Sequence, residues 1–161
     1  MLGMVSIAAR LVARRRRGRC FADSAVCPVG LSGASVAILH VEDNDSVRRA
    51  VHRALTVFGL AVVSVEGVGA AKAALAERTD ITGALLDIQL GDGSGIDLYQ
   101  WISTHRPDLA ERVAFVTGNA DAESSAPLAA IGCPVFPKPC AILDLTRVAA
   151  EWEDAADASP R

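Results

Sequence analysis

The chain has 161 residues, a mass of 16.8 kDa and a net charge of −3, which is the size of one domain with a short extension. Hydrophobic residues make up 51% and charged residues 22% of the sequence, so a wholly disordered chain and a collagen-like chain are excluded. Aromatic residues are only 4%, which argues against a surface that stacks on nucleic-acid bases.

The charge is unevenly distributed along the chain. Residues 1–33 contain six arginines and one acid, a net charge of +5, whereas residues 34–161 carry ten basic and eighteen acidic side chains, a net charge of −8. An acidic body repels DNA phosphates, so direct DNA binding by the body is disfavoured. We expect a basic leader at 1–33, either disordered or the product of a misassigned start, a folded domain at 34–152, and a frayed polar tail at 153–161.

No segment is apolar over the about 18 residues that a membrane-spanning helix needs. The leader places its apolar residues before its arginines, the reverse of a secretory signal, although its composition somewhat resembles an organellar transit peptide. The four cysteines lack the close spacing of structural zinc ligands, so we expect reduced thiols in a cytoplasmic protein. They are Cys20, Cys27, Cys133 and Cys140.

The body alternates short apolar runs with amphipathic stretches. This pattern predicts strands buried on both faces, separated by helices with one apolar side. The predicted strands are 36–41, 60–65, 83–87, 112–117 and 133–136. The predicted helices are 45–59, 70–78, 95–105, 122–131 and 142–152. The alternation implies a parallel α/β sheet covered by helices on both faces.

Helix ends and turns have their own signals. Asp45 or Ser46 is expected to cap the first helix, Gly59 to end it, and Ser94 to cap the third. The glycine-rich stretch 91–95 reads as a loop. Pro127 makes the predicted helix 122–131 short and weak.

Polar residues follow four of the predicted strands. In open parallel sheets, ligands bind beyond the carboxyl ends of the strands, so we expect these side chains to meet at one edge. They are Glu42, Asp43, Asp87, Thr117 and Lys138.

Each of these residue types has a chemical reason to be there. Asp43 and Asp87 can give hard oxygen ligands to Mg²⁺, with Glu42 holding a metal-bound water and the backbone carbonyl of Gln89 completing the protein ligands. Asp87 can then act as nucleophile toward a phosphoryl group, whose repulsion the metal offsets.

Further donors would stabilise that phosphoryl group. Lys138 supplies a point positive charge. The Thr117 hydroxyl and the backbone N–H groups of Ile88 and Gly118 can donate hydrogen bonds, and Gly118 leaves room for an attacking water.

Four short motifs then resemble one known family. VEDN at 41–44, LLDIQLGDGSGIDL at 85–98, FVTGNA at 115–120 and FPKPC at 136–140 together resemble a response-regulator receiver domain over roughly 35–152. The resemblance implies a flavodoxin-like (βα)5 doubly wound sheet of order 2-1-3-4-5, and a Lys138–Pro139 bond that can be cis. It also implies phosphorylation of Asp87, with Mg²⁺, by a histidine kinase or a histidine phosphotransfer protein.

The sequence departs from the family pattern in its fifth strand. Val135 occupies the position, three residues before the lysine, where the family usually has an aromatic residue or His that turns inward on activation. Phe136 is adjacent but should face the other side of the sheet. Gly91 stands where a proline is common. The readout of phosphorylation is therefore expected to be altered, or to use another surface.

No output domain follows the predicted receiver, so we expect a stand-alone module that signals by protein–protein contact or serves as a phosphate shuttle or sink. One alternative is a receiver-like interaction domain that is not phosphorylated. A second is a metal-dependent phosphohydrolase with an aspartyl nucleophile, although Gln89 occupies the position where that class needs a second Asp. The sequence leaves open the downstream partner and whether the chain forms a homodimer.

Several conspicuous side chains have ordinary interpretations. His40 is expected in the core with its hydrogen bonds satisfied. His52 lies on the polar side of the first helix with Arg48, Arg49 and Arg53, which is either a solvated face or a docking patch for an acidic partner. Asp92 and Asp97 are expected to be solvated acids, and Trp101 and Trp152 are expected to be packing residues.

Overall fold

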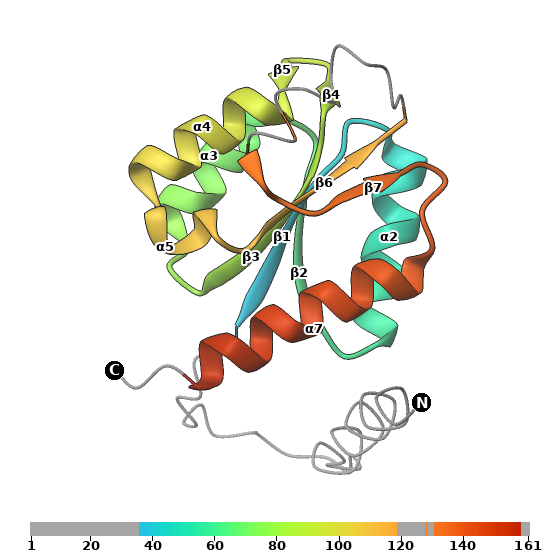
Figure 1. Cartoon of the computed structure of the whole chain (residues 1–161). Helices are drawn as coiled ribbons and strands as arrows, with labels where there is room; N and C mark the ends of the chain where they lie inside the picture. Colours follow the sequence, from blue (N-terminus) through green and yellow to red (C-terminus); the bar gives the residue numbers. More distant parts are fainter. Residues whose placement is uncertain (1–35, 119–127, 129–130, 159–161) are drawn as a thin grey trace, which may run out of the picture. The chain divides into compact units, whose positions relative to one another are not determined.

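The computed structural model describes residues 36–118, 128 and 131–158, with side chains described as far as Trp152. The chain divides into residues 1–34 and 35–161, and all the described residues lie in the second unit. This unit is built on a five-stranded sheet with helices on both of its faces (Figure 1).

The main sheet has the order β2-β1-β3-β6-β7, and all its neighbouring strands pair in parallel. Counting only these strands along the chain, the order is the predicted 2-1-3-4-5, and the flavodoxin-like α/β class is confirmed. All of β1 and β6 is buried, as expected for strands covered on both faces. The strands are β1 (Ala37–Val41), β2 (Ala61–Val65), β3 (Ile81–Asp87), β6 (Val113–Thr117) and β7 (Val135–Pro137).

The helices form two layers. In Figure 1, α3, α4 and α5 cover one face of the sheet, and α2 and α7 cover the other. Their bounds are α2 (Asp45–Val57), α3 (Val68–Glu77), α4 (Gly95–His105), α5 (Pro107–Ala110) and α7 (Ile142–Ala158).

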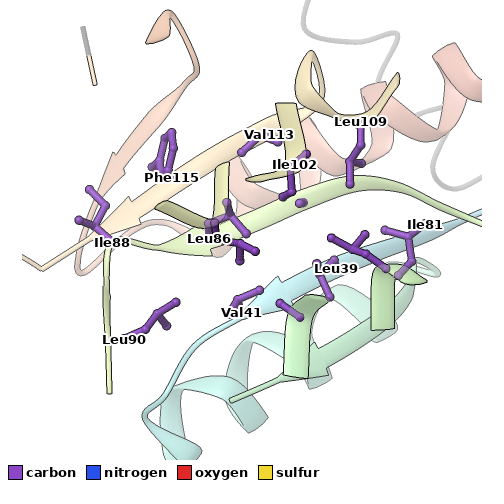
Figure 2. Close-up of a cluster of buried hydrophobic side chains, with 14 of the residues drawn as sticks. Leu39, Val41, Ile81, Leu86, Ile88, Leu90, Ile102, Leu109, Val113 and Phe115 are labelled. Carbon is purple, nitrogen blue, oxygen red and sulfur yellow. The ribbon is translucent and has the colours of Figure 1, made fainter. Parts of the chain in front are cut away.

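Side chains alternate along each strand, so the sheet separates two cores. Leu39, Leu86 and Phe115 belong to the core beneath α3, α4 and α5 (Figure 2). The second core, beneath α2 and α7, includes Trp152, which packs as predicted. Trp152 lies directly over Gly83, where an added Cβ would come 2.3 Å from Trp152 Cε3.

The start of α2 differs from the prediction. The Asn44 side chain accepts hydrogen bonds from the N–H groups of Ser46 and Val47 at 3.0 and 3.2 Å, so the cap is Asn44, not Asp45 or Ser46. Asn caps helices as well as Asp or Ser does, and the choice depends on where the chain turns. Gly59 follows α2 with a φ of 89°, and Ser94 caps α4 by accepting from Ile96, both as predicted.

Other differences concern short or marginal elements. The stretch 91–95, predicted as a plain loop, contains the turn and second strand of a two-stranded antiparallel hairpin, formed by β4 (Gln89–Leu90) and β5 (Gly93–Ser94). The short helix α5 was not predicted, and β7 is shifted to Val135–Pro137. Helix α7 runs to Ala158, so the expected tail is helical to that point, in keeping with its alanines. The predicted helix 122–131 lies largely outside the described residues.

Among the helices that the structure describes, none has the length and apolar character required to cross a bilayer.

Candidate functional site

The carboxyl ends of β1 and β3 bring three carboxylates together. Val41 pairs with Leu86 in the sheet, so the residues that follow each strand emerge side by side. Glu42, Asp43 and Asp87 each have a carboxylate oxygen within 4.8 Å of the others. Glu42 and Asp87 are only 2% and 6% exposed, whereas Asp43 is exposed. The group is therefore anchored in the sheet and open to solvent on one side.

Lys138 joins this cluster from the loop after β7. Its ammonium donates to Glu42 Oε2 and to Asp87 Oδ2, both at 2.6 Å. Its backbone N–H donates to the Thr117 carbonyl at 2.6 Å, and the Lys138–Pro139 bond is cis, as the resemblance implied. One ammonium group thus bridges two buried carboxylates from different strands.

Burial and charge act against each other at this bridge. Burial raises the pKa of Glu42, and the hydrogen bond from Lys138 only partly opposes that rise. Burial lowers the pKa of Lys138, but the hydrogen bonds to Asp87 and Glu42 outweigh it and the net pKa is raised. Lys138 is therefore charged at neutral pH. Three carboxylates against one ammonium leave a negative site that favours a further cation.

The Asp87 carboxylate is oriented from both of its oxygens. Lys138 contacts Oδ2, and the Gln89 N–H donates to Oδ1 at 3.2 Å. Behind it, the start of α4 packs so tightly that a Cβ on Gly95 would lie 2.1 Å from the Asp87 carbonyl oxygen. The Gly95 N–H also donates to the Ile88 carbonyl at 3.0 Å. A residue without a side chain is therefore required at Gly95.

The groups predicted to donate hydrogen bonds to a phosphoryl group lie at the same sheet edge, but one of them already has a partner. Val116 pairs with Asp87, so the buried Thr117 and the exposed Gly118 follow beside it. The Ile88 N–H, however, donates to the Val116 carbonyl at 3.3 Å and would have to share or change this partner to serve a ligand. The Gln89 N–H, which sequence reasoning did not select, already faces the carboxylate.

The residues fit a hard divalent cation. Mg²⁺ prefers carboxylate, carbonyl and water oxygens, and this donor set consists of carboxylates with one exposed member. The β4–β5 hairpin, which includes Gln89, lies against them, since a Cβ on Gly91 would be 3.7 Å from Asp43 Oδ2. The hairpin backbone therefore lies beside the cluster.

His40 lies in the core as predicted, but not with all its hydrogen bonds satisfied. It is 3% exposed, and its Nδ1 has no hydrogen-bond partner among the described residues. Burial, followed by the charge of Lys138, lowers its pKa to about 4. His40 is therefore neutral at pH 7, and the sequence had no signal for the missing partner.

His52 is not simply part of a solvated face. Its Nδ1 lies 2.9 Å from the Ser64 hydroxyl on β2, and both residues line a hollow of about 240 Å³ with Arg48, Arg49 and Arg53. The contact spans two elements, so the helical pattern alone could not predict it. This basic hollow is a structured feature of the surface.

Asp92 is an exposed loop acid, as expected, but it also binds to another element of the fold. Its two carboxylate oxygens accept hydrogen bonds from the N–H groups of Val68 and Gly69 at 2.8 and 2.9 Å. These bonds lower the pKa of Asp92. The partners are more than twenty positions apart in sequence, so no local pattern could reveal them. Asp97 is exposed as expected.

The position of the usual aromatic switch is also clear. Val135 is 39% exposed, whereas Phe136 packs against the core beneath α2 and α7. The two side chains face opposite sides of β7, as strand alternation predicts. Phe136 therefore cannot replace the aromatic residue that Val135 lacks.

The comparisons with known proteins agree with this geometry. The sequence model of one protein family, the response regulator receiver domain, matches residues 38–149. The chain belongs to the response regulator receiver domain family. The comparison with curated proteins finds no match.

Solved receiver domains share the fold at low sequence identity. A receiver protein from Pseudomonas putida is 24% identical, covers 72% of this chain and 96% of its own, and has a TM-score of 0.66. A CheY-like receiver from Methanospirillum hungatei JF-1 is 24% identical, with 77% and 98% covered and a TM-score of 0.66. A receiver from Clostridium thermocellum is 19% identical, with 76% and 97% covered and a TM-score of 0.68.

Membership of this family has a functional consequence. Receiver domains are signalling domains of two-component systems and not classical enzymes, and they typically bind Mg²⁺ at an acidic pocket. In this receiver domain the corresponding acids are Glu42, Asp43 and Asp87.

Proposed function

We propose that this receiver domain is a phosphoacceptor and that Asp87 receives the phosphoryl group. The observation that carries the proposal is the Lys138 ammonium group, which bridges Glu42 and Asp87 at 2.6 Å beside Asp43. A buried carboxylate with a lysine on one oxygen and an open, negatively charged side is suited to accept phosphate with a divalent cation.

The transfer places a new bond on Asp87. A carboxylate oxygen attacks phosphorus, the phosphorus–nitrogen bond of a donor phosphohistidine breaks, and the departing imidazole nitrogen keeps the electron pair and takes up a proton. Lys138 then pairs with phosphoryl oxygens, with Thr117 and the Gly118 N–H as further donors. When bound, Mg²⁺ offsets the repulsion between the phosphoryl oxygens and the carboxylates.

The metal ligands follow from the same cluster. Asp43 and Asp87 would bind the ion directly, Glu42 through a water, and Gln89 through its backbone carbonyl. Asp43 is the exposed member, so an ion can reach the site from solvent.

The donor is proposed to be a histidine kinase or a histidine phosphotransfer protein. The basic hollow around His52 supports this proposal, because its arginines could bind acidic side chains of the donor protein. Among the described residues, the Arg53 side chain has no hydrogen-bond or ion-pair partner, and the Arg49 side chain pairs only with the exposed Asp45 at 2.6 Å, a contact that solvent screens. A partner carboxylate could therefore replace solvent at either arginine.

Val135 bears on what the phosphorylated state does. An exposed valine cannot undergo the inward ring rotation that the family commonly uses, so a shuttle or sink role is favoured over output through this strand. The same observation supports the second candidate, a receiver-like interaction domain that is never phosphorylated. A phosphohydrolase is disfavoured, because Gln89 offers no general acid.

Intact-protein mass spectrometry after incubation with acetyl phosphate and MgCl₂ tests the proposal. The native chain should gain one phosphoryl group, and Asp87→Asn should gain none. EDTA in the reaction should prevent the gain. If the native chain gains nothing from acetyl phosphate or from a phosphorylated histidine phosphotransfer protein, the interaction-domain alternative replaces this proposal.

A further inference from the structure

Asp92 connects two parts of the fold that the sequence separates. It lies between β4 and β5, and its carboxylate accepts from the first two N–H groups of α3, those of Val68 and Gly69. The residue that precedes α3, Gly67, provides no side-chain cap. The N-terminus of α3 is therefore capped from the hairpin and not from its own chain segment.

The hairpin also contacts the cluster of carboxylates. Gln89 donates its N–H to Asp87 Oδ1, and a Cβ on Gly91 would lie 3.7 Å from Asp43 Oδ2. Leu90 is buried in the core beneath α3 and α4. A change in the hairpin would thus move groups that face Asp43 and Asp87.

We propose that Asp92 is a positioning residue for the cation site: by fixing the β4–β5 hairpin to the N-terminus of α3, it holds the Gln89 backbone where the cation needs it. This inference rests on the proposed function, because it assumes that Glu42, Asp43 and Asp87 bind Mg²⁺. Groups that orient metal ligands from outside the ligand shell commonly affect metal affinity.

The exposed Asp92 carboxylate lies close to Gly67. A Cβ on Gly67 would lie 2.3 Å from Asp92 Oδ1 and 2.8 Å from Oδ2. Gly67 has an extended backbone with φ −174°, a conformation that alanine also adopts. Gly67→Ala should therefore displace the Asp92 carboxylate without straining its own backbone.

The coupling must act in both directions. If Asp92 helps the cation to bind, the cation must strengthen the contact between Asp92 and α3 by the same factor. The amides of Val68 and Gly69 should therefore exchange more slowly with solvent when Mg²⁺ is bound. A residue that only caps α3 would protect these amides equally with and without the ion.

The test is calorimetric titration of the full chain with MgCl₂, combined with amide hydrogen exchange. Asp92→Ala should raise the Mg²⁺ dissociation constant about tenfold, the lower end of the losses in metal affinity that follow removal of a group that orients metal ligands. Asp92→Asn keeps one acceptor oxygen and should show a smaller rise. In Asp92→Ala, Mg²⁺ should no longer change exchange at Val68 and Gly69.

Two controls separate position from charge. Asp97→Ala removes an equal charge at the exposed start of α4 and should leave the dissociation constant within about 1.5-fold of native, since exposed charges are screened. Gly67→Ala should weaken binding when Asp92 is present and have no further effect in Asp92→Ala, because the group it displaces is then gone.

The outcomes distinguish this inference from the proposed function. If the native chain binds no Mg²⁺, both are overturned. If the native chain binds and Asp92→Ala binds equally well, only the positioning role is overturned. Equal weakening in Asp92→Asn and Asp92→Ala, or in Asp97→Ala, would assign the effect to charge and also overturn it.

Discussion

Lys138→Met tests whether the lysine holds two buried carboxylates in place. The substitution leaves Glu42 and Asp87, 2% and 6% exposed, without the ammonium group that contacts both at 2.6 Å. Loss of one partner from a fully buried ion pair costs about 3–5 kcal/mol. The Lys138 side chain is 24% exposed, so water screens part of this loss. We expect a loss of about 2 kcal/mol in the free energy of unfolding.

The assay is thermal and urea unfolding in EDTA, beside Lys72→Met. A loss of that size corresponds to a fall of about 8 °C in Tm for a domain of this length. Lys72 is the chain's other lysine and contacts the Trp101 ring, 5.6 Å from its centroid, so its variant removes the same charge away from the site. Equal stability of the two variants would refute the reasoning.

The pH dependence of the stability cost of Lys138→Met is a second, independent test. Burial raises the pKa of Glu42 above 4.5, and Lys138 opposes that rise, so Lys138→Met should raise it further. A carboxyl group whose pKa is higher in the folded state binds more protons there, and stability falls as pH rises through that folded value. The cost of Lys138→Met should therefore be larger at pH 7.5 than near pH 4.5. A cost that does not change with pH would contradict this assignment.

Three further predictions concern stability. In EDTA, the free energy of unfolding should fall as pH drops from 6.5 toward 4, because His40 has a pKa of about 4 in the folded state and the unfolded state therefore binds the proton first. The full effect is about 3 kcal/mol. In His40→Leu, the urea midpoint should depend less on pH than in the native chain. Gly83→Ala should lower stability by about 1–3 kcal/mol by urea unfolding, since its Cβ would meet Trp152; unchanged stability would mean that the ring relaxes freely. Asn44→Ala should cost about 1 kcal/mol by the same assay, and Asn44→Asp should restore it.

The sheet and the cluster of polar side chains at its edge could be predicted because their signals are local. Each strand is a short apolar run, and in a parallel sheet the residue after such a run has only one edge at which to emerge. Asp87 directly ends β3 and Glu42 directly follows β1, so their meeting depends only on correct strand boundaries and strand order.

The connections between elements could not be predicted, for a physical reason. The Asp92 bonds to α3 and the His52 contact with Ser64 join residues on separate elements. Whether they form depends on the distance between packed layers, which side-chain volumes across the core determine. Asn44 is a different case, because Asn directly before an amphipathic stretch is a cap signal and could have been weighed equally with Asp45.

The contacts between separate elements bear on how the domain could signal. A bound phosphoryl group shifts a conformational equilibrium only by its difference in affinity for the two states. Val135 has no ring that could move between an exposed and a buried position in the two states, and its side chain is already 39% exposed. The contacts from the carboxylate cluster through the β4–β5 hairpin to α3 do link the site to a helix, by way of Asp92. If this domain has a conformational output, the start of α3 is therefore a better place to look for it than the exposed face of β7.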